Sequence, residues 1–302
     1  MESLSEQIKA VLPPERILIN EPMNVHTTFR TGGAADLFLL PENKDELSRL
    51  IKLLKEGGKD YLIIGNGSNL LVSDRGFRGA VIQITDRFSK IKVNDTELYA
   101  GAGTLLSRIA DTAMKNSLTG FEFASGIPGT AGGAMVMNAG AYGGEMKDVV
   151  KEVEVLDKEG EFITLSNSDM DFSYRRSAVR EKGYTVISVT FTLQKGDRES
   201  ISRTMEELSA KRREKQPLEF PSAGSTFKRP EGNFAGKLIM EAGLRGFTIG
   251  GASVSEKHCG FVVNKGGATS DDIYKVINEV QQRVQASSGI RLEPEVLMIG
   301  EF

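Results

Sequence analysis

The amino-acid sequence predicts an α+β protein organised in three parts. Segments with helical periodicity alternate with short apolar strands, and a strongly charged helical segment, about 199–215, separates the last hundred residues from the rest. The 302 residues include 39% hydrophobic and 26% charged residues, which is ordinary for a globular protein and sufficient for a sizeable core. We predict that the parts are 1–85, 86–200 and 201–302.

The first part is predicted to be an α/β unit. Its main helix begins after Asn43-Lys-Asp-Glu46, which resembles a capping box, and it places Leu47, Leu50 and Ile51 on one face. In order, the expected elements are a helix over 3–11, a strand, glycine turn and strand over 26–41, the helix just described, and strands over 61–64 and 79–84.

The second and third parts are predicted to consist of shorter elements. The segments 152–166 and 184–194 show the alternation expected of a hairpin and of a long strand. The other expected elements are helices over 105–115, 199–215, 235–241 and 270–285, and strands near 251–254, 259–264 and 291–299.

Composition argues against several classes of protein. The net charge of −3 gives no reason to expect a nucleic-acid partner, and the single cysteine, Cys259, excludes an internal disulfide. One cysteine and two histidines do not suit a zinc site, so no metal is expected. The N-terminus lacks the apolar core of a signal peptide, and no stretch approaches the roughly 20 apolar residues of a membrane span. We expect a monomeric, cytoplasmic protein that acts on small molecules.

The most informative stretch runs from Gly126 to Gly144, with seven glycines in nineteen residues and no Lys, Arg, Asp or Glu. Such bare backbone can approach a ligand closely, and its free N–H groups can point at an anion. A smaller turn, Gly65-Asn-Gly67, follows the apolar run 61–64. Two such loops suggest a large phosphate-bearing cofactor held by main chain. The alternatives are a plain turn at Gly65–Gly67 and tight packing of turns between short strands at 126–144.

Neither loop matches a common nucleotide motif. Leu70 stands where the third glycine of G-x-G-x-x-G belongs, and no convincing βαβ unit with a suitably placed acidic residue follows. A Rossmann site is therefore disfavoured. The sequence contains no G-x-x-x-x-G-K-[ST], which excludes a P-loop.

Six motifs, in order and at compatible spacing from about His26 to the C-terminus, resemble one known family. They resemble the UDP-N-acetylenolpyruvoylglucosamine reductases, flavoenzymes that make UDP-N-acetylmuramate for bacterial peptidoglycan synthesis. The chain is most similar to the shorter subtype, type II, which lacks an extra tyrosine-bearing loop over the substrate. The motifs are GNGSNLLV (65–72), GIPGTAGGAMVMNAGAYGGE (126–145), YRRS (174–177), PSAGSTFKRP (221–230), SEKHCGFVVN (255–264) and LEPEVLMIG (292–300).

The resemblance implies the FAD-binding fold of vanillyl-alcohol oxidase and p-cresol methylhydroxylase (PCMH). In that fold, two α+β domains, here 1–85 and 86–200, hold FAD non-covalently, and a C-terminal substrate-binding domain, here 201–302, closes over the sugar nucleotide. The segments around Gly65–Asn69 and Gly126–Gly133 are implied to line the FAD pyrophosphate, and Asn138 to Ala141 to lie near the flavin. The implied cofactor residues are Gly65, Asn66, Gly67, Ser68, Asn69, Gly126, Ile127, Pro128, Gly129, Thr130, Gly132, Gly133, Asn138, Gly140 and Ala141.

The resemblance also implies a reaction with two halves. NADPH passes a hydride to FAD, and the reduced flavin N5 then gives a hydride to C3 of the enolpyruvyl group while a proton is added at C2. Arg175 is the implied catalytic arginine, since a guanidinium stays charged and can bind a carboxylate with two donors. Ser225 is the implied proton donor, and its acidity would have to be raised by its surroundings. Glu295 is the implied catalytic glutamate, which would work best protonated or hydrogen-bonded.

Several neighbouring residues receive weaker assignments. Tyr174 and Lys215 are implied to contact substrate, although packing of Tyr174 and solvation of Lys215 at the end of the charged helix are the alternatives. His258 is expected to be structural or to lie near the site's rim, and Cys259 to be buried and inert. Leu297 occupies a position where the family often has a basic residue, and no substrate contact is assigned to it.

Two other functions compete with this hypothesis. An oxidase of the same flavin fold would often tether FAD through His or Tyr, whereas this chain has only two histidines. A non-catalytic nucleotide-binding module would explain the glycines but not the motifs around Arg175, Ser225 and Glu295.

Overall fold

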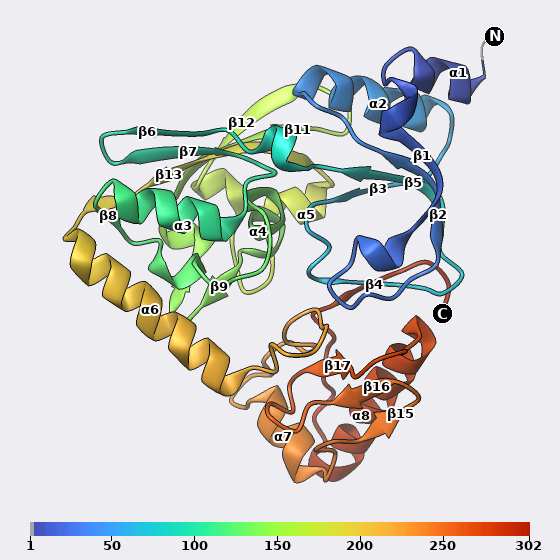
Figure 1. Cartoon of the computed structure of the whole chain (residues 1–302), viewed down its shortest axis with the longest axis vertical. Helices are drawn as coiled ribbons and strands as arrows, with labels where there is room; N and C mark the ends of the chain where they lie inside the picture. The colour runs from blue at the N-terminus through green and yellow to red at the C-terminus, as the bar shows by residue number, and fades with distance from the viewer. Residues whose placement is uncertain (1–2) are drawn as a thin grey trace. The chain divides into compact units, whose positions relative to one another are not determined.

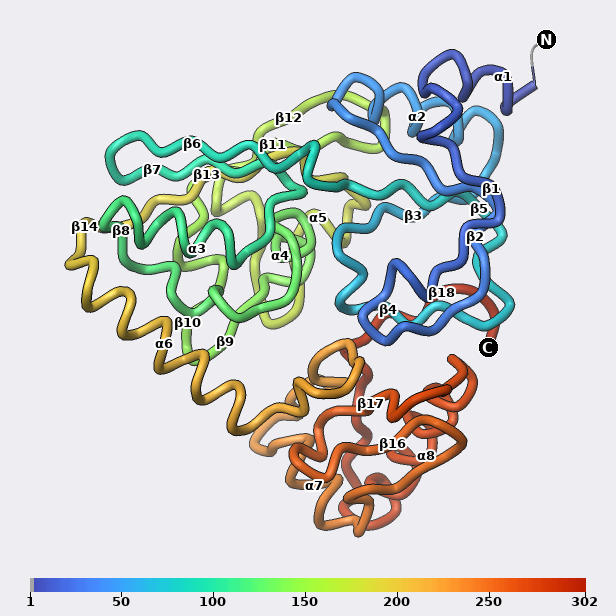
Figure 2. The backbone as a smooth tube through the Cα atoms, viewed as in Figure 1, coloured from blue at the N-terminus to red at the C-terminus, as the bar shows by residue number. Residues whose placement is uncertain are grey.

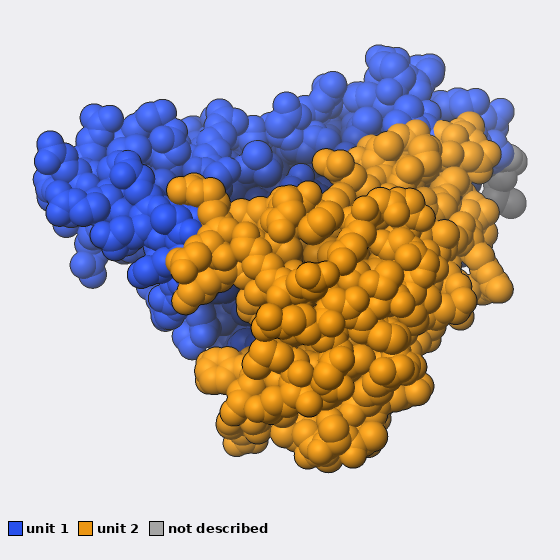
Figure 3. Space-filling model, turned by 60° about the horizontal axis from the view of Figure 1, so that its bottom comes forward, with its two compact units in different colours: residues 1–18, 37–66, 79–212 blue, residues 19–36, 67–78, 213–302 orange. Residues whose placement is uncertain are grey.

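The computed structural model describes residues 3–302 (Figure 1). The chain forms two compact units, each assembled from several stretches of backbone that can be followed in Figure 2 and are coloured separately in Figure 3. The predicted division into domains at 1–85, 86–200 and 201–302 stays a prediction. Unit 1 contains the chain up to Leu18, Leu37–Asn66 and Gly79–Arg212, and unit 2 contains Ile19–Asp36, Gly67–Arg78 and Arg213–Phe302.

An antiparallel five-stranded sheet, in the order β12-β11-β13-β7-β6, lies in unit 1. Five consecutive residues of its central strand, Thr185–Val189, are buried, so both faces of the strand are covered there and burial does not follow the period-two alternation of the sequence. The hairpin predicted over 152–166 and the long strand predicted over 184–194 are confirmed. The strands are β6 (Ile91–Asn94), β7 (Glu97–Gly101), β11 (Val150–Leu156), β12 (Phe162–Ser166) and β13 (Thr185–Thr192).

Helices of unit 1 contribute to one hydrophobic core with this sheet. The predicted cap of the second helix is present, because the Asn43 side chain accepts a hydrogen bond from the Glu46 amide at 2.9 Å. The Glu46 carboxylate in turn receives two hydrogen bonds from the nearly buried guanidinium of Arg16. The helices are α1 (Leu4–Lys9), α2 (Lys44–Glu56), α3 (Leu106–Lys115), α4 (Ala131–Met137), α5 (Ala178–Lys182) and α6 (Arg198–Lys215), of which α6 continues into unit 2.

A second sheet, in the order β1-β2-β5-β3, contains the strand that leads into the first glycine turn. The boundary between the units falls inside β1, β2 and β5, whereas β3 lies wholly in unit 1 and pairs in parallel with β5 from Tyr61↔Ala80 to Ile64↔Gln83. The strands are β1 (Ile17–Pro22), β2 (Ala34–Leu39), β3 (Tyr61–Ile64) and β5 (Phe77–Gln83).

Unit 2 has its own core around the long helix α8 and a small antiparallel sheet, β15-β16-β17. A capping box of Thr269 and Asp272 starts α8, and Gly289, at φ +73°, ends it. A separate parallel pair joins β4 to the last strand, β18. The elements are β4 (Leu70–Val72), α7 (Ala235–Glu241), β15 (Thr248–Ile249), β16 (Ala252–Val254), β17 (Val262–Asn264), α8 (Ser270–Ser288) and β18 (Leu297–Ile299).

Short elements complete the description of residues 3–302. Within that range, no helix combines the length and the apolar character that crossing a bilayer requires. The short strands are β8 (Leu118–Thr119), β9 (Gly140–Ala141), β10 (Gly144–Glu145) and β14 (Gln194–Lys195), and the 3₁₀ helices are Pro14–Arg16, Met23–Val25, Asp86–Phe88, Glu122–Ala124, Met146–Asp148 and Ser168–Met170.

The structure corrects three expectations about local structure. The first strand predicted within 26–41 does not form; a strand precedes that segment instead, as β1. The strand predicted over 291–299 is regular only in β18, because Pro294 has no N–H to donate to a ladder. Helix α4 was not predicted, since its two glycines disfavour helix, but burial of Ala131, Ala134 and Met135 stabilises it.

Candidate active site

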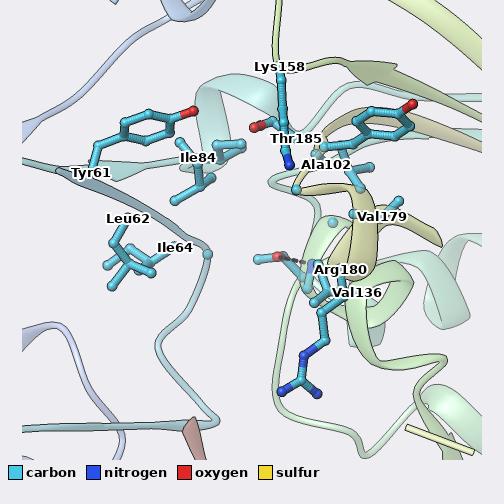
Figure 4. Close-up of a pocket in the computed structure, with 18 of the residues that line it drawn as sticks. Tyr61, Leu62, Ile64, Ile84, Ala102, Val136, Lys158, Val179, Arg180 and Thr185 are labelled. Carbon is cyan, nitrogen blue, oxygen red and sulfur yellow. Dashed lines mark hydrogen bonds between the residues drawn. The ribbon is translucent and has the colours of Figure 1, made fainter. Parts of the chain in front are cut away.

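A cavity of about 470 Å³ lies within unit 1 and has a size typical of small-molecule sites. Tyr61, Leu62 and Ile64 of β3 stand on one side of it, and side chains of α4 and α5 on the other (Figure 4). Much of the wall is aliphatic. Three cationic side chains also line the cavity, from Lys55, Lys158 and Arg180.

Helix α4 brings bare backbone to this cavity. Gly132 and Gly133 lie in its first turn, directly after the N-cap Thr130. Their amides are engaged within the protein: the Gly132 amide donates to Ala102 O at 2.9 Å and the Gly133 amide to Thr130 Oγ1 at 3.4 Å. At these two positions the expectation of free N–H groups is wrong, and the glycines provide space for close approach instead.

The glycines of the cavity are bare for different reasons. A Cβ atom on Gly65 would lie 2.4 Å from Thr130 Oγ1, so protein packing alone excludes a side chain there. A Cβ on Gly133 would meet only Thr130 Oγ1, at 3.7 Å, and Gly133 has no positive φ. Since glycine weakens a helix and packing does not demand it here, the free space beside Gly133 fits a ligand that needs close approach to backbone. The residues present therefore fit a cofactor held by main chain.

The first glycine loop is divided between the units. Gly65 and Asn66 belong to unit 1, and Gly67, Ser68 and Asn69 belong to unit 2. Gly67 has φ +60°, and a Cβ there would lie 1.9 Å from His26 O, so the plain-turn explanation accounts for this glycine. All the other predicted cofactor residues, from Gly126 to Ala141, lie in unit 1.

Asn69 contacts the backbone around Glu295 within unit 2. The side-chain nitrogen of Asn69 donates to Glu295 O at 3.0 Å. The backbone carbonyl oxygen of Asn69 accepts from the Leu297 amide at 2.9 Å. The amide of Glu295 in turn donates to Thr226 O at 2.8 Å, so the backbone of Glu295 is bonded both to Asn69 and to Thr226. Glu295 is itself half-buried.

Ser225 stands beside the same segment. The isolated bridge between Phe227 and Pro294 pairs the two stretches of chain antiparallel, which brings the backbone of Ser225 close to that of Glu295. Ser225 is exposed, whereas its sequence competitor Thr226 is fully buried and its hydroxyl accepts from the Val262 amide at 2.9 Å. Of the two hydroxyls, Ser225 is therefore the one available to a ligand.

Glu293, the alternative to Glu295, is occupied elsewhere. Its exposed carboxylate pairs with Lys228 at 3.0 Å, and that hydrogen bond lowers the pKa of Glu293 below its ordinary value. A carboxyl held ionised at the surface is poorly suited to a site that needs a protonated acid.

Arg175 lies in unit 1, at the tip of a tight turn. Ser173 and Arg176 exchange two backbone hydrogen bonds of 3.2 and 3.1 Å, and Arg175 between them has φ +59°, which is uncommon for a residue with a side chain. Its guanidinium lies 4.9 Å from the ring of Tyr174, whose side chain is 48% exposed. Lys215, the other predicted substrate residue, is exposed at the end of α6 and belongs to unit 2.

One cation beside the glycine-rich stretch was missed by sequence reasoning. Arg212 of α6 packs so closely that a Cβ on Gly126 would lie 2.8 Å from its Nη1. Burial lowers the pKa of Arg212 below its usual range. No sequence signal distinguished it from the solvated Lys and Arg residues of the same charged helix.

His258 and Cys259 are placed as expected of structural residues. Cys259 is buried, and His258 Nδ1 accepts from the Gly260 amide at 3.1 Å while its ring packs edge-on against Phe261. Burial lowers the pKa of His258 below its ordinary value. Within residues 3–302, no cluster of three or more His, Cys, Asp or Glu side chains could hold a metal ion.

Comparison with known proteins defines the class. The profile of the FAD binding domain matches residues 35–166. A Phl p 4 variant described as a glucose oxidase shares the fold over 65% of this chain, at 14% identity and a TM-score of 0.52. The chain is thus a flavoprotein with an α+β fold of the PCMH type, and its cofactor is FAD.

The particular family follows from nearly full-length similarity. The profile of the C-terminal domain of UDP-N-acetylenolpyruvoylglucosamine reductase matches residues 216–299. The enzyme of that name from Clostridioides difficile (strain 630) is 52% identical over 96% of both chains. The crystal structure of the corresponding reductase (MurB) from Thermus caldophilus covers 94% of this chain and 98% of its own, at 35% identity and a TM-score of 0.80. The chain belongs to the UDP-N-acetylenolpyruvoylglucosamine reductase family.

Replacing Gly133 by alanine should weaken FAD binding without weakening the fold. The added methyl enters the space beside the cavity, whereas alanine favours a helix over glycine by about 1 kcal/mol. We expect the FAD dissociation constant to rise about tenfold or more, measured by flavin fluorescence, with the melting temperature of the FAD-free chain unchanged or raised.

Gly132→Ala is the comparison variant: this glycine also lines the cavity, but the added methyl would meet packed protein. A Cβ on Gly132 would lie 3.1 Å from the Ala102 Cβ and 3.3 Å from its carbonyl oxygen, so it should lower the melting temperature of the FAD-free chain. Unchanged FAD affinity in Gly133→Ala would remove Gly133 from the cofactor site.

Protonation of His258 should make the folded chain less stable in mild acid. Because its pKa is lower in the folded chain than in the unfolded chain, its stabilising contribution is complete above the unfolded value of about 6.5 and is lost as the pH falls through the folded value. Urea unfolding at pH 5 to 8 should show stability decreasing toward pH 5, and more weakly so in His258→Gln. The cost of repacking is read at pH 8, and equal pH dependence of the two proteins would contradict this account.

Proposed function

We propose that this protein is the NADPH-dependent reductase that converts UDP-N-acetylglucosamine enolpyruvate to UDP-N-acetylmuramate, a precursor of peptidoglycan. The observation that carries the proposal is family membership over nearly the whole chain, at about half identical residues. The conversion adds a hydride at C3 and a proton at C2 of the enolpyruvyl group. FAD, when bound, supplies the redox chemistry by taking a hydride from NADPH and passing it to the substrate.

The residues proposed to hold FAD are those that contribute bare main chain. Gly65, Thr130, Gly132 and Gly133 line the cavity of unit 1. The bare backbone allows close approach of the cofactor, the cationic side chains of Lys55, Lys158 and Arg180 suit its phosphates, and the aliphatic wall suits its apolar parts. Gly126, Ile127, Pro128 and Gly129 precede helix α4 and are proposed as cofactor residues with Asn66, Gly67, Ser68, Asn69, Gly140 and Ala141.

Arg175 is proposed to hold the substrate carboxylate and to stabilise the negative charge that spreads onto it during the reaction. A permanently charged, forked guanidinium does this better than a lysine ammonium, since two donors fix the orientation of the carboxylate. The turn between Ser173 and Arg176 supports this role, because its two backbone hydrogen bonds fix the main chain on both sides of Arg175. Tyr174 and Lys215 are proposed to bind other parts of the substrate.

Ser225 is proposed to donate the proton to C2, and Glu295 to act beside it. The exposure of Ser225 and the burial of Thr226 support this assignment. A serine hydroxyl is a weak acid, so donation requires a neighbouring group that stabilises or replaces its proton. Glu295 is the carboxyl held in the adjoining segment of unit 2 and is the proposed partner.

The two half-reactions separate this proposal from its competitor. NADPH should bleach the flavin of the purified protein anaerobically, and UDP-N-acetylglucosamine enolpyruvate should then restore its colour. Recovery of colour with oxygen alone, and no response to the enolpyruvate substrate, would instead support an oxidase of the same fold.

Ser225→Ala should block only the second half-reaction. NADPH should still bleach the flavin at the parent rate, while reoxidation by the enolpyruvate substrate slows by about 10²- to 10⁴-fold, because the proton source is missing. Stopped-flow absorbance of the flavin measures both rates. Thr226→Ser, which keeps a hydroxyl at the buried position, is the control. Parent-like reoxidation in Ser225→Ala would reject Ser225 as the proton donor.

A further inference from the structure

We infer that Asn138 is a positioning residue, which acts on the reaction by holding the turn that carries Arg175. The inference rests on the proposed role of Arg175. Asn138 is 1% exposed and stands directly after the last residue of α4, in the left-handed conformation with φ +42°. Resemblance to the family placed Asn138 near the flavin, whereas the contacts below direct its side chain toward the protein.

The hydrogen-bonding groups of the Asn138 side chain are used inside unit 1. Its amide nitrogen donates to Ser173 O at 3.1 Å and to the Glu145 carboxylate at 2.8 Å. Its amide oxygen accepts from the Lys147 amide at 3.0 Å. Both donors of the nitrogen are therefore committed, and one of them goes to the residue that opens the Arg175 turn.

A second bond ties the other end of the turn to the same helix. The hydroxyl of Ser177, which is fully buried, donates to Val136 O at 3.1 Å. The turn between Ser173 and Arg176 is thus fastened to the C-terminal end of α4 both before and after Arg175. The first turn of this helix lines the cavity through Gly132 and Gly133.

This arrangement explains why Arg175 can occupy an unfavourable conformation. A non-glycine residue at φ +59° persists when its surroundings over-determine it. The bond from the buried Asn138 side chain to Ser173 O supplies part of that restraint. Loss of the bond should let the turn relax, and Arg175 would then present its guanidinium to the substrate in the wrong orientation.

Asn138→Gly tests the side chain without disturbing the backbone, since glycine adopts positive φ readily. We expect it to retain FAD and the rate of flavin reduction by NADPH, and to slow reoxidation by the enolpyruvate substrate by about tenfold to a hundredfold. Asn138→Asp combined with Glu145→Gln, which avoids placing two carboxylates in contact, keeps the acceptor but cannot donate to Ser173 O, and this double variant serves if the glycine variant does not fold.

A double-mutant cycle with Arg175→Lys identifies the route of the effect. Arg175→Lys alone should slow reoxidation strongly, because the two-pronged contact is lost. If Asn138 acts through Arg175, adding Asn138→Gly to Arg175→Lys should change the rate by less than about twofold. Hydrogen exchange of the amides at 173–177 provides a readout independent of turnover, and it should be faster in Asn138→Gly.

Asn167→Ala is the matched control, because the side-chain nitrogen of Asn167 also donates two hydrogen bonds, to Lys147 O and Val150 O, but none to the turn. It should leave both readouts at the parent value. Strong loss in Arg175→Lys with normal reoxidation in Asn138→Gly, or independent effects that multiply in the double variant, would overturn this inference alone. Normal turnover of Arg175→Lys would overturn the proposed role of Arg175 and this inference with it.

Discussion

The proposed chemistry of unit 1 depends on one short helix, α4. Its first turn must lack side chains beside the cavity, and its C-terminal end must hold the turn that carries Arg175. Helix α4 has only seven residues, and glycines in its first turn reduce its intrinsic stability. Amides of that first turn are satisfied by Ala102 and Thr104, and its other end holds Asn138. These tertiary bonds let the chain keep backbone without side chains beside a cavity. Without them, the sequence of α4 would favour a flexible loop.

In unit 2, backbone hydrogen bonds join stretches of chain that carry the proposed proton donor and its partner. The stretch that contains Ser225 and the stretch that contains Glu295 are far apart in sequence, and the hydrogen bond from the Glu295 amide to Thr226 O joins them. Asn69 binds the Glu295 segment through a further hydrogen bond, to Glu295 O. Asn69 belongs to the first glycine loop. The loop that the resemblance assigned to the cofactor thus also supports the segment that carries Glu295, the proposed partner of the proton donor.

Elements with strong local signals were predictable from sequence, and elements that depend on distant bonds were not. The capped, amphipathic α2 was correctly predicted, because Asn43 and the leucine spacing lie within one helix. Helix α4 was missed because its stabilising partners lie near residue 103. The family motifs pointed to Arg175, Ser225 and Glu295, but no motif contains the 35-residue separation between Asn138 and Ser173. Arg212 was missed because no neighbouring residue in the sequence distinguishes a half-buried arginine from the exposed ones of the same charged helix.

The central claim is that the glycine-lined cavity of unit 1 receives FAD against bare main chain. The most direct measurement is a crystal structure of the protein purified with its flavin. The account predicts density for the phosphate-bearing part of FAD next to Gly65, Thr130 and Gly133. Density for FAD elsewhere, with solvent filling this cavity, would contradict it.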